Sequence, residues 1–333
     1  MTVKAWTLYG NAWRGLYRHS LLAVIAAVSL ILSAGVIAAK EPLSQYAYND
    51  TRGLVSLVED AATLIERHGD KAFDAFGEAN SRWFNQDYYL FVYALDGTCV
   101  FHPVTPDLIG KNIMPLRDMN GKPIIQQITE IGGRPESDAS GWVFYLWQDQ
   151  MQLTPAWKSA YIRKATTPDG KRYVVGSGSF SIKVEKPFVE NQVRTAADRL
   201  ASSGKAEAFK QFQDPASPFV FLDTFVFVLD EQGRTLVDPA FPTMAGRDLT
   251  QLKDAVGFYP VREALKKLTH ADEAWVQYLW RKPGSATSSR KLMYVRKVVV
   301  GGDTLIVGSD FFLATPIWMR VEDAAAWLRN PPG

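Results

Sequence analysis

Two kinds of hydrophobic pattern alternate along the chain and predict helices and strands in a repeated order. Apolar residues recur at spacings of three and four over 54–65 and 72–76, and again over 193–200 and 208–212, which is typical of helices. Short apolar runs predict strands over 142–147, 159–164 and 173–180, and over 275–280, 292–298 and 304–311. Consecutive strands joined by hairpins indicate antiparallel sheets, so each set predicts an α+β unit.

The two sets form an internal repeat. The letters WVFYLW at 142–147 return as WVQYLW at 275–280, VGS at 175–177 returns as VGS at 307–309, and FVYALD at 91–96 aligns with FVFVLD at 225–230. The order is preserved and the offset stays between 132 and 136 residues. A period this long excludes a solenoid and indicates a duplicated domain.

The N-terminal region contains one long apolar run. Residues 21–39 carry no charged side chain, and these 19 positions give about 28 Å of helix, enough to cross a bilayer core. Lys4, Arg14 and Arg18 precede the run, which favours a cytoplasmic N-terminus. We predict a cytoplasmic leader over 1–20 and a transmembrane anchor over 21–39, with the bulk of the chain in the periplasm of a bacterium, on a single-pass inner-membrane protein.

A cleaved signal peptide is the alternative for this segment. Small residues at 33–35 and 38–39 offer a cleavage site. Both interpretations export the rest of the chain.

Composition excludes several classes of function. The net charge of +2 and the lack of a basic stripe argue against a nucleic-acid partner. Cys99 is the one cysteine, and none of the four histidines is paired at helical spacing, so we expect no disulfide within the chain and no metal site. No nucleophile, phosphate-loop or dinucleotide motif is present, so we expect no enzyme, no catalytic residues and no cofactor.

An ordered set of short motifs resembles a known family. Over residues 45–182 the chain contains Leu95-Asp96-Gly97, His102-Pro103, Gly110-Lys111-Asn112, Gly141-Trp142 and Val175-Gly176-Ser177. In this order and spacing they resemble the single Cache domain of bacterial chemoreceptors and sensor kinases, and residues 185–315 resemble it more weakly. The resemblance implies a PAS-like antiparallel sheet entered by a long helix, with periplasmic binding of small organic ligands, often short carboxylates.

The predicted architecture therefore has one N-terminal transmembrane helix followed by two PAS-like antiparallel-sheet Cache modules joined by helices. We place the first module at 41–182 and the second at 185–315, with a C-terminal helix and tail over 316–333.

Side chains on the strands of the first module predict a carboxylate site. Alternation places Tyr161 and Arg163 on one face, and a guanidinium beside a phenol in an aromatic cage suits a carboxylate. The predicted ligand-binding set is Tyr145, Trp147, Lys158, Tyr161, Arg163 and His102. The alternative places Arg163 on the solvent face of an edge strand and His102 on the surface.

The second module repeats this set with changes. The equivalents are Tyr278, Trp280, Lys291, Tyr294, Arg296 and Asp238, the last in place of the histidine. Asp310 stands where the first module has Gly178. These departures leave open whether the second module binds a ligand.

Two functional hypotheses follow. Family members usually continue into a second membrane helix and a cytoplasmic signalling domain, and this sequence shows neither. We therefore expect a sensing module that binds a small organic ligand and passes the signal to a separate membrane-embedded partner protein. The alternative is a non-catalytic structural or accessory subunit of a membrane complex, with the modules as protein-interaction surfaces. A homodimer is compatible with either.

Overall fold

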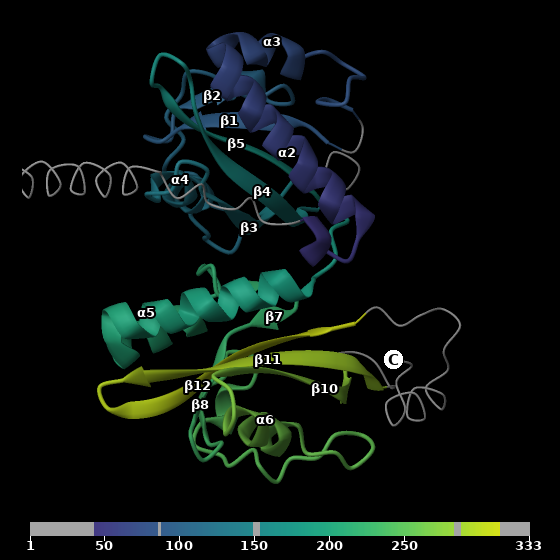
Figure 1. Cartoon of the computed structure of the whole chain (residues 1–333), viewed down its shortest axis with the longest axis vertical. Coiled ribbons are helices and arrows are strands. Elements are labelled where there is room, and N and C mark those ends of the chain that lie inside the picture. Colours follow the sequence, from purple (N-terminus) through teal and green to yellow (C-terminus); the bar gives the residue numbers. More distant parts are fainter. Residues whose placement is uncertain (1–42, 86–87, 149–153, 283–287, 314–333) are drawn as a thin grey trace, which may run out of the picture. The chain divides into compact units, whose positions relative to one another are not determined.

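Two five-stranded antiparallel sheets with the same strand order make up the computed structural model, which describes residues 43–85, 88–148, 154–282 and 288–313. The first sheet has the order β2-β1-β5-β4-β3 and the second β9-β8-β12-β11-β10 (Figure 1). Each sheet is built from its own half of the chain, which confirms the duplicated α+β domain.

The elements of the first module begin with a short 3₁₀ turn. Its helices are η1 (Leu43–Gln45), α2 (Asn49–His68), η2 (Gly69–Lys71), α3 (Ala72–Phe76), η3 (Pro106–Leu108) and α4 (Ile124–Gly133). Its strands are β1 (Leu90–Ala94), β2 (Cys99–Phe101), β3 (Ser140–Trp147), β4 (Ala156–Thr166) and β5 (Arg172–Ser179).

The elements of the second module repeat this order, with a small ribbon added. Its helices are α5 (Lys186–Gln213), η4 (Pro242–Met244) and α6 (Pro260–Leu268). Its sheet strands are β8 (Phe227–Asp230), β9 (Thr235–Val237), β10 (Glu273–Arg281), β11 (Ser288–Val300) and β12 (Asp303–Phe312), and the ribbon consists of β6 (Val220–Phe221) and β7 (Thr224–Phe225). Five of the six strands predicted above fall within observed strands, and the sixth, 173–180, extends one residue beyond the end of β5.

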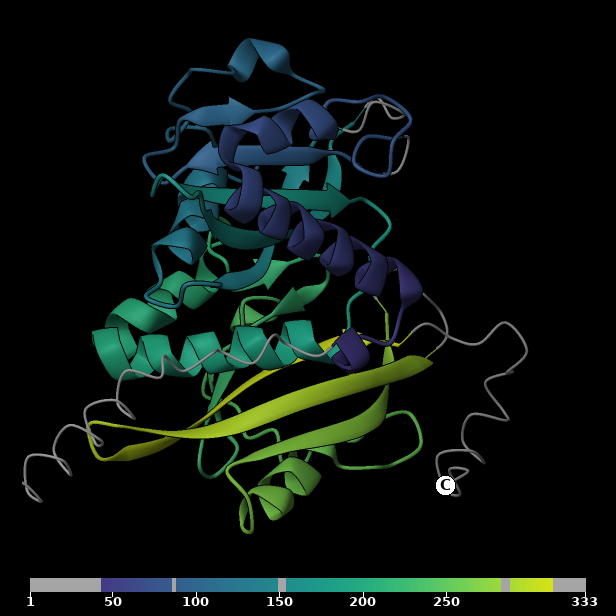
Figure 2. The same cartoon turned by 45° about the horizontal axis from the view of Figure 1, so that its top comes forward.

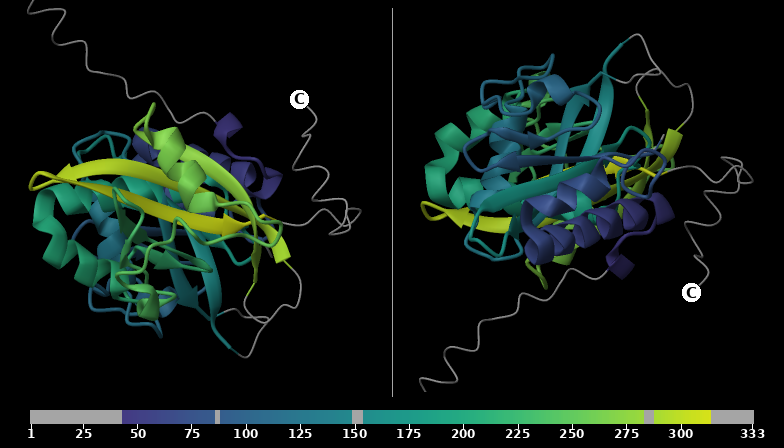
Figure 3. Two further views of the ribbon diagram at one scale, coloured as in Figure 1. Left: turned by 90° about the horizontal axis from the view of Figure 1, so that it is seen from below. Right: turned by 90° about the horizontal axis from the view of Figure 1, so that it is seen from above.

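Each sheet is covered by helices on both faces. In the first module α2 runs obliquely across β4 and β5 (Figure 2), and α4 packs on the opposite face against β3, β4 and β5. In the second, α5 packs on β11 and β12, while α6 lies over β10 on the other face (Figure 3, left). Each module therefore has two cores, one on either side of its sheet, and the strands are apolar on both faces.

Glycines interrupt both long helical regions. The predicted helical patterns over 54–65 and 72–76 are separated at Gly69, which ends α2 with φ of 61°. In α5 the corresponding interruption is at Gly204, whose φ of 76° and ψ of 171° leave the helical region. Glycine adopts a positive φ without the steric cost that other residues meet, which explains its place at both breaks.

Glu185 substitutes for a local cap at the start of α2. Tyr48, the residue before this helix, makes no side-chain capping bond. Instead the buried carboxylate of Glu185 accepts hydrogen bonds from the backbone N–H groups of Ala47 and Tyr48 and from the Thr51 hydroxyl. The segment between the two sheets is thus tied to the first helix of the first module.

The sheet register corrects one part of the repeat alignment. Phe91 pairs with Gly176, and Phe227 pairs with Gly308, so Phe91 corresponds to Phe227 and not to Phe225. A Cβ on either glycine would approach the paired phenylalanine ring within 2.6 Å, so only glycine fits opposite each ring. The alignment by letters was shifted by two residues because a strand pattern of period two matches itself equally well after that shift.

Two predicted terminal segments and the predicted membrane span remain to be compared with the structure. The predicted anchor at 21–39 and the predicted tail at 316–333 lie outside the described residues. Within the ranges that the structure describes, no helix combines the length and the apolar character that a membrane span requires.

Candidate ligand sites

The predicted site residues of the first module lie on two opposite faces of the sheet. In the β3–β4 register Tyr145 pairs with Lys158, and Trp142 pairs with Tyr161. Tyr145 and Lys158 therefore point to the α4 side, whereas Tyr161 and Arg163 point to the α2 side. The prediction that one cage combines Arg163 with Tyr145 is wrong, because an odd-numbered residue of β3 shares a face with an even-numbered residue of β4.

Arg163 and Tyr161 hold helix α2 on the sheet. The Arg163 guanidinium lies 3.5 Å from a carboxylate oxygen of Glu59 and 3.3 Å from one of Glu66, and the Tyr161 hydroxyl donates to Glu59 over 2.9 Å. Burial and the neighbouring Glu59 raise the pKa of Tyr161. Arg163 is only 9% exposed on an internal strand, so the alternative of a solvent-facing edge position is also wrong. The polar groups of Arg163 and Tyr161 are therefore engaged in contacts with α2.

Lys158 forms the centre of an aromatic cluster on the α4 side. Its side chain is 1% exposed, and its Nζ donates to the Tyr89 hydroxyl over 2.6 Å. The ring centroids of Tyr89, Phe91 and Phe180 lie 4.0, 5.9 and 5.7 Å from Nζ. No carboxylate of the described residues pairs with this ammonium, and burial lowers the pKa of Lys158 to about 7. A buried cation without an anion is costly, and an anionic ligand would offset that cost.

His102 completes this cluster as a neutral hydrogen-bond donor. Its ring is buried, and Nδ1 accepts the backbone N–H of Thr105 over 3.0 Å, so the proton of the neutral ring is on Nε2. Burial, together with the charge of Lys158, lowers the pKa of His102 to about 4. The ring lies 5.3 Å from that of Tyr89. His102 is therefore part of this buried cluster and not on the surface, and Lys158 carries its positive charge alone.

Tyr145 and Trp147 belong to the same face. Their rings meet edge to face with centroids 5.9 Å apart, and Tyr145 is opposite Lys158 in the register. Of the six predicted residues the structure thus brings together Tyr145, Trp147, Lys158 and His102. Tyr89 was missed, because the shifted repeat alignment gave it no partner; its true equivalent is Phe225.

The equivalent cluster in the second module has a different charge. The Lys291 ammonium lies 2.7 Å from Oδ1 of Asp310, and both side chains are 8% exposed. Oδ2 of Asp310 accepts the Tyr278 hydroxyl over 2.7 Å. Tyr278 pairs with Lys291 in the register and meets Trp280 edge to face, as Tyr145 meets Trp147. The lysine is therefore neutralised within the fold.

Tyr294 and Arg296 lie on the opposite face of their sheet, as their equivalents do. Tyr294 packs against Trp275 on the α5 side, with ring centroids 5.0 Å apart. Arg296 pairs with Glu273 over 2.8 Å in a partly exposed position. Their inclusion in one predicted site with Tyr278 and Trp280 is wrong for the same reason of register.

A cavity of about 280 Å³ adjoins the second cluster. Its polar lining comprises Asp238, Asp310, Lys291 and Tyr278, and the rest of its wall is largely apolar. This volume is near the lower end of typical ligand pockets, and suits a small organic molecule. Sequence reasoning left this module open, yet a cavity forms in it.

An aspartate holds the covering loop in both modules. Asp118 accepts the backbone N–H of Leu146 over 2.9 Å, and Asp254 accepts that of Leu279 over 3.0 Å. The other oxygen of each carboxylate binds backbone N–H groups of its own loop. Each loop is thereby fixed to the strand that carries the site tyrosine and tryptophan.

Comparison with known proteins gives two matches, which overlap over residues 160–185. The model described as a Cache domain matches residues 64–185, and the model described as Single Cache domain 2 matches residues 160–311. The second match covers most of the module in which the sequence motifs were weaker.

Three solved structures illustrate the similarity. A periplasmic sensor domain of a chemotaxis protein is 22% identical, with 38% of this chain and 88% of that chain covered and a TM-score of 0.31. A Cache chemosensory domain described for carboxylic acid recognition is 20% identical, with coverage of 38% and 86% and a TM-score of 0.31. A methyl-accepting chemotaxis protein from Vibrio parahaemolyticus RIMD 2210633 is 20% identical, with coverage of 39% and 88% and a TM-score of 0.32.

Proposed function

The chain belongs to the Cache family of extracytoplasmic sensor domains, with two modules in tandem, and from this premise we propose that its first module senses a small carboxylate. The ligand carboxylate accepts hydrogen bonds from the Lys158 ammonium and the His102 Nε2–H. The rings of Tyr89, Tyr145 and Trp147 exclude water around it. A charge-assisted hydrogen bond in such a site is stronger than one in water.

The observation that carries this proposal is the buried ammonium of Lys158. It is 1% exposed, it lies among aromatic rings, and its described polar partner is the neutral phenol of Tyr89. Family membership alone leaves the ligand undefined, because Cache domains are typically non-catalytic modules for ligands of several kinds. The unmatched positive charge favours an anion over a neutral or cationic ligand.

Calorimetric titration of the purified full-length chain tests the proposal, with acetate, propionate and pyruvate as probes. Lys158→Met keeps an unbranched side chain that is one heavy atom shorter, and removes its charge. We expect it to weaken binding of the preferred carboxylate by roughly ten- to hundredfold, the equivalent of one charge-assisted hydrogen bond.

Two phenol variants provide a matched control. Tyr89→Phe removes the hydroxyl that contacts Lys158 and should weaken binding, whereas Tyr161→Phe removes a hydroxyl on the opposite face and should leave it unchanged. Equal affinity in wild type and Lys158→Met, or no saturable binding of any probe, would reject the carboxylate site. The second result would favour the accessory-subunit role, in which the modules contact other proteins.

We further propose that the signal passes to a separate partner protein and that the segment 21–39 anchors the chain in the membrane. The support is the apolar run itself, with three basic residues before it. Fractionation and N-terminal sequencing of the mature protein test the anchor. A mature N-terminus close to Lys40 would show instead that the segment is a cleaved signal.

A further inference from the structure

The cavity of the second module has an apolar body and one polar end. The apolar wall includes Phe225, Phe227, Leu249, Val261, Trp280 and Met293. They come from the five-stranded sheet, from the β6–β7 ribbon, from α6 and from the loop before it, so the wall is built mainly on regular elements. Phe241 also lines the cavity and is half exposed, which places it at the rim.

The polar end contains more negative than positive charge. Asp310 and Asp238 both line the cavity, and Lys291 is the single cation among its described lining residues. Lys291 is already paired with Asp310 over 2.7 Å, so the charge of Asp238 has no cation of its own there. Two carboxylates and one ammonium leave a net negative charge, the inverse of the first module, where Lys158 stands alone.

One oxygen of the Asp238 carboxylate has no hydrogen-bond donor among the described residues. Oδ1 of Asp238 accepts the backbone N–H groups of Ala240 and Phe241, over 3.1 and 2.9 Å. Oδ1 of Asp310 is buried and lies 2.7 Å from the Lys291 ammonium, and the described residues provide no second donor to it. Burial and the nearby Asp310 raise the pKa of the Asp238 carboxyl. Each feature is relieved by a donor that brings positive charge.

We propose that the cavity of the second module binds a small organic cation, a primary amine with an apolar body. Its ammonium group donates hydrogen bonds to Asp238 and Asp310, and its apolar part packs against Phe227, Val261 and Met293. The site is separate from the carboxylate site of the first module and does not depend on it. The protein would then respond to two ligands of opposite charge.

The test is calorimetric titration of the full-length chain with phenethylamine, phenethyl alcohol and phenylacetate, which share one apolar body and differ in charge. We expect phenethylamine to bind at least about tenfold more tightly than the neutral alcohol, the equivalent of one charge-assisted hydrogen bond. Hexylamine and propylamine repeat the comparison with narrower and shorter bodies. No saturable binding of any of the three amines would overturn the proposal.

Matched variants locate the site. Asp238→Asn keeps the shape of the turn and its acceptor, and should weaken amine binding at least about tenfold. Asp230→Asn is the control: this aspartate also accepts turn N–H groups, from Gln232 and Arg234, but it does not line the cavity, so affinity should stay unchanged. Equal amine affinity in wild type and Asp238→Asn would overturn the proposal, as would tighter binding of the alcohol.

Two further variants separate this proposal from the first. Lys158→Met should leave amine binding intact, and its loss there would place the amine in the first module and overturn the assignment. The double variant Asp238→Asn/Asp310→Asn gives the second module the charge of the first, and should prefer phenylacetate to phenethylamine when measured in the Lys158→Met background. An unchanged preference for the amine would contradict the charge argument.

Discussion

The two modules use one scaffold to build side-chain clusters of opposite charge. Lys158 and Lys291 occupy equivalent positions, each opposite a tyrosine of the neighbouring strand. In the first module the strand on the other side contributes Gly178, and in the second it contributes Asp310. His102 of the first module is replaced by Asp238 in the second. Two substitutions thus convert an unmatched ammonium into a matched pair with an extra carboxylate.

This difference shows that the retained residue does not define the ligand by itself. A lysine in a buried site attracts an anion only when the fold leaves it unpaired. The residue at the position of Gly178 decides this, and it lies on a different strand from the lysine. A Cβ at Gly178 would approach Lys158 Cε to 2.8 Å and the Ser159 carbonyl oxygen to 2.9 Å, so the first module has no room there for a carboxylate.

The largest expected effect is a contrast in stability between the same substitution in the two modules. Lys291→Met leaves the buried Asp310 carboxylate without its ion pair and should reduce the free energy of unfolding by about 3–5 kcal/mol. Lys158→Met removes a buried cation that has no anionic partner among the described residues, and should raise the free energy of unfolding. Denaturant unfolding of both variants at neutral pH measures the contrast.

The increase in the free energy of unfolding that we expect for Lys158→Met should depend on pH in a defined direction. Burial places the pKa of Lys158 at about 7 in the folded protein, below its ordinary value of 10.5. Between these values the unfolded chain binds more protons, so the cost of burying the charge is complete below pH 7 and disappears as the pH rises to 10.5. The stability that Lys158→Met gains over the wild type should therefore be largest below pH 7 and should disappear towards pH 10.5. A stability gain that increases with pH would contradict the unpaired state of Lys158.

The next largest effect concerns ligand affinity and pH. A carboxylate needs the charged form of Lys158, so its affinity should fall by up to about tenfold per pH unit above pH 7, until the pKa of the complex is reached.

The affinity for an amine should change with pH in the other direction. Asp238 faces Asp310, Lys291 and Tyr278, and its raised pKa means that acid neutralises it, so amine affinity should rise as the pH rises from the acid side.

Titrations of both ligands across the same pH series measure these slopes in one preparation. Parallel slopes for carboxylate and amine would remove the basis for assigning opposite charges to the two sites.

The fold could be predicted from the sequence because its signals are local. Alternating apolar runs located all six long strands, and the repeated WVFYLW and VGS letters revealed the duplication. Glycine marked the break after α2 at Gly69. Each of these features depends on residues close together in the chain.

The site was only partly predictable because it depends on register between strands. Alternation within a strand correctly placed Tyr161 and Arg163 on one face of β4, and Tyr145 and Trp147 on one face of β3. It does not say whether these two faces lie on the same side of the sheet. Only the pairing of Tyr145 with Lys158 settles this, and the sequence of a hairpin does not reveal it. The exchange of Gly178 for Asp310 was visible, but its effect on Lys291 became clear only from the pairing of three strands.

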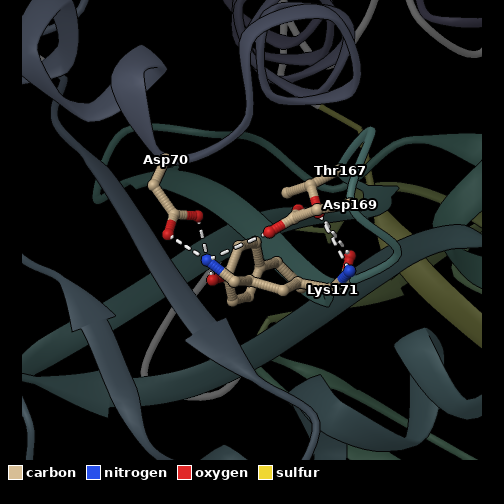
Figure 4. A network of polar contacts seen from close by, with 5 residues as sticks. Asp70, Thr167, Asp169 and Lys171 are labelled. Carbon is tan, nitrogen blue, oxygen red and sulfur yellow. Dashed lines mark hydrogen bonds and ion pairs between the residues drawn. The ribbon is translucent and has the colours of Figure 1, made fainter.

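The smallest expected effect is at a surface network of the first module, which serves as a control for the charge arguments. Lys171 contacts Asp70 over 2.6 Å and Asp169 over 3.4 Å, and the turn is closed by Thr167 (Figure 4). The hydrogen bond to Asp70 raises the pKa of Lys171 to about 12. Solvent screens such exposed pairs, so Lys171→Ala should leave the melting temperature and both ligand affinities unchanged within error.

A loss of stability in Lys171→Ala as large as that in Lys291→Met would mean that exposed and buried ion pairs contribute equally to this fold. That result would contradict the contrast between the two modules.

The most direct test of two opposite sites is a competition titration of the full-length chain. The protein is first saturated with the carboxylate that it prefers and is then titrated with phenethylamine, and the order is reversed in a second experiment. We predict that each ligand binds with one site per chain whether or not the other is present. We also predict that Lys158→Met abolishes only the carboxylate step and Asp238→Asn only the amine step. Displacement of one ligand by the other, or loss of both steps in a single variant, would contradict the account.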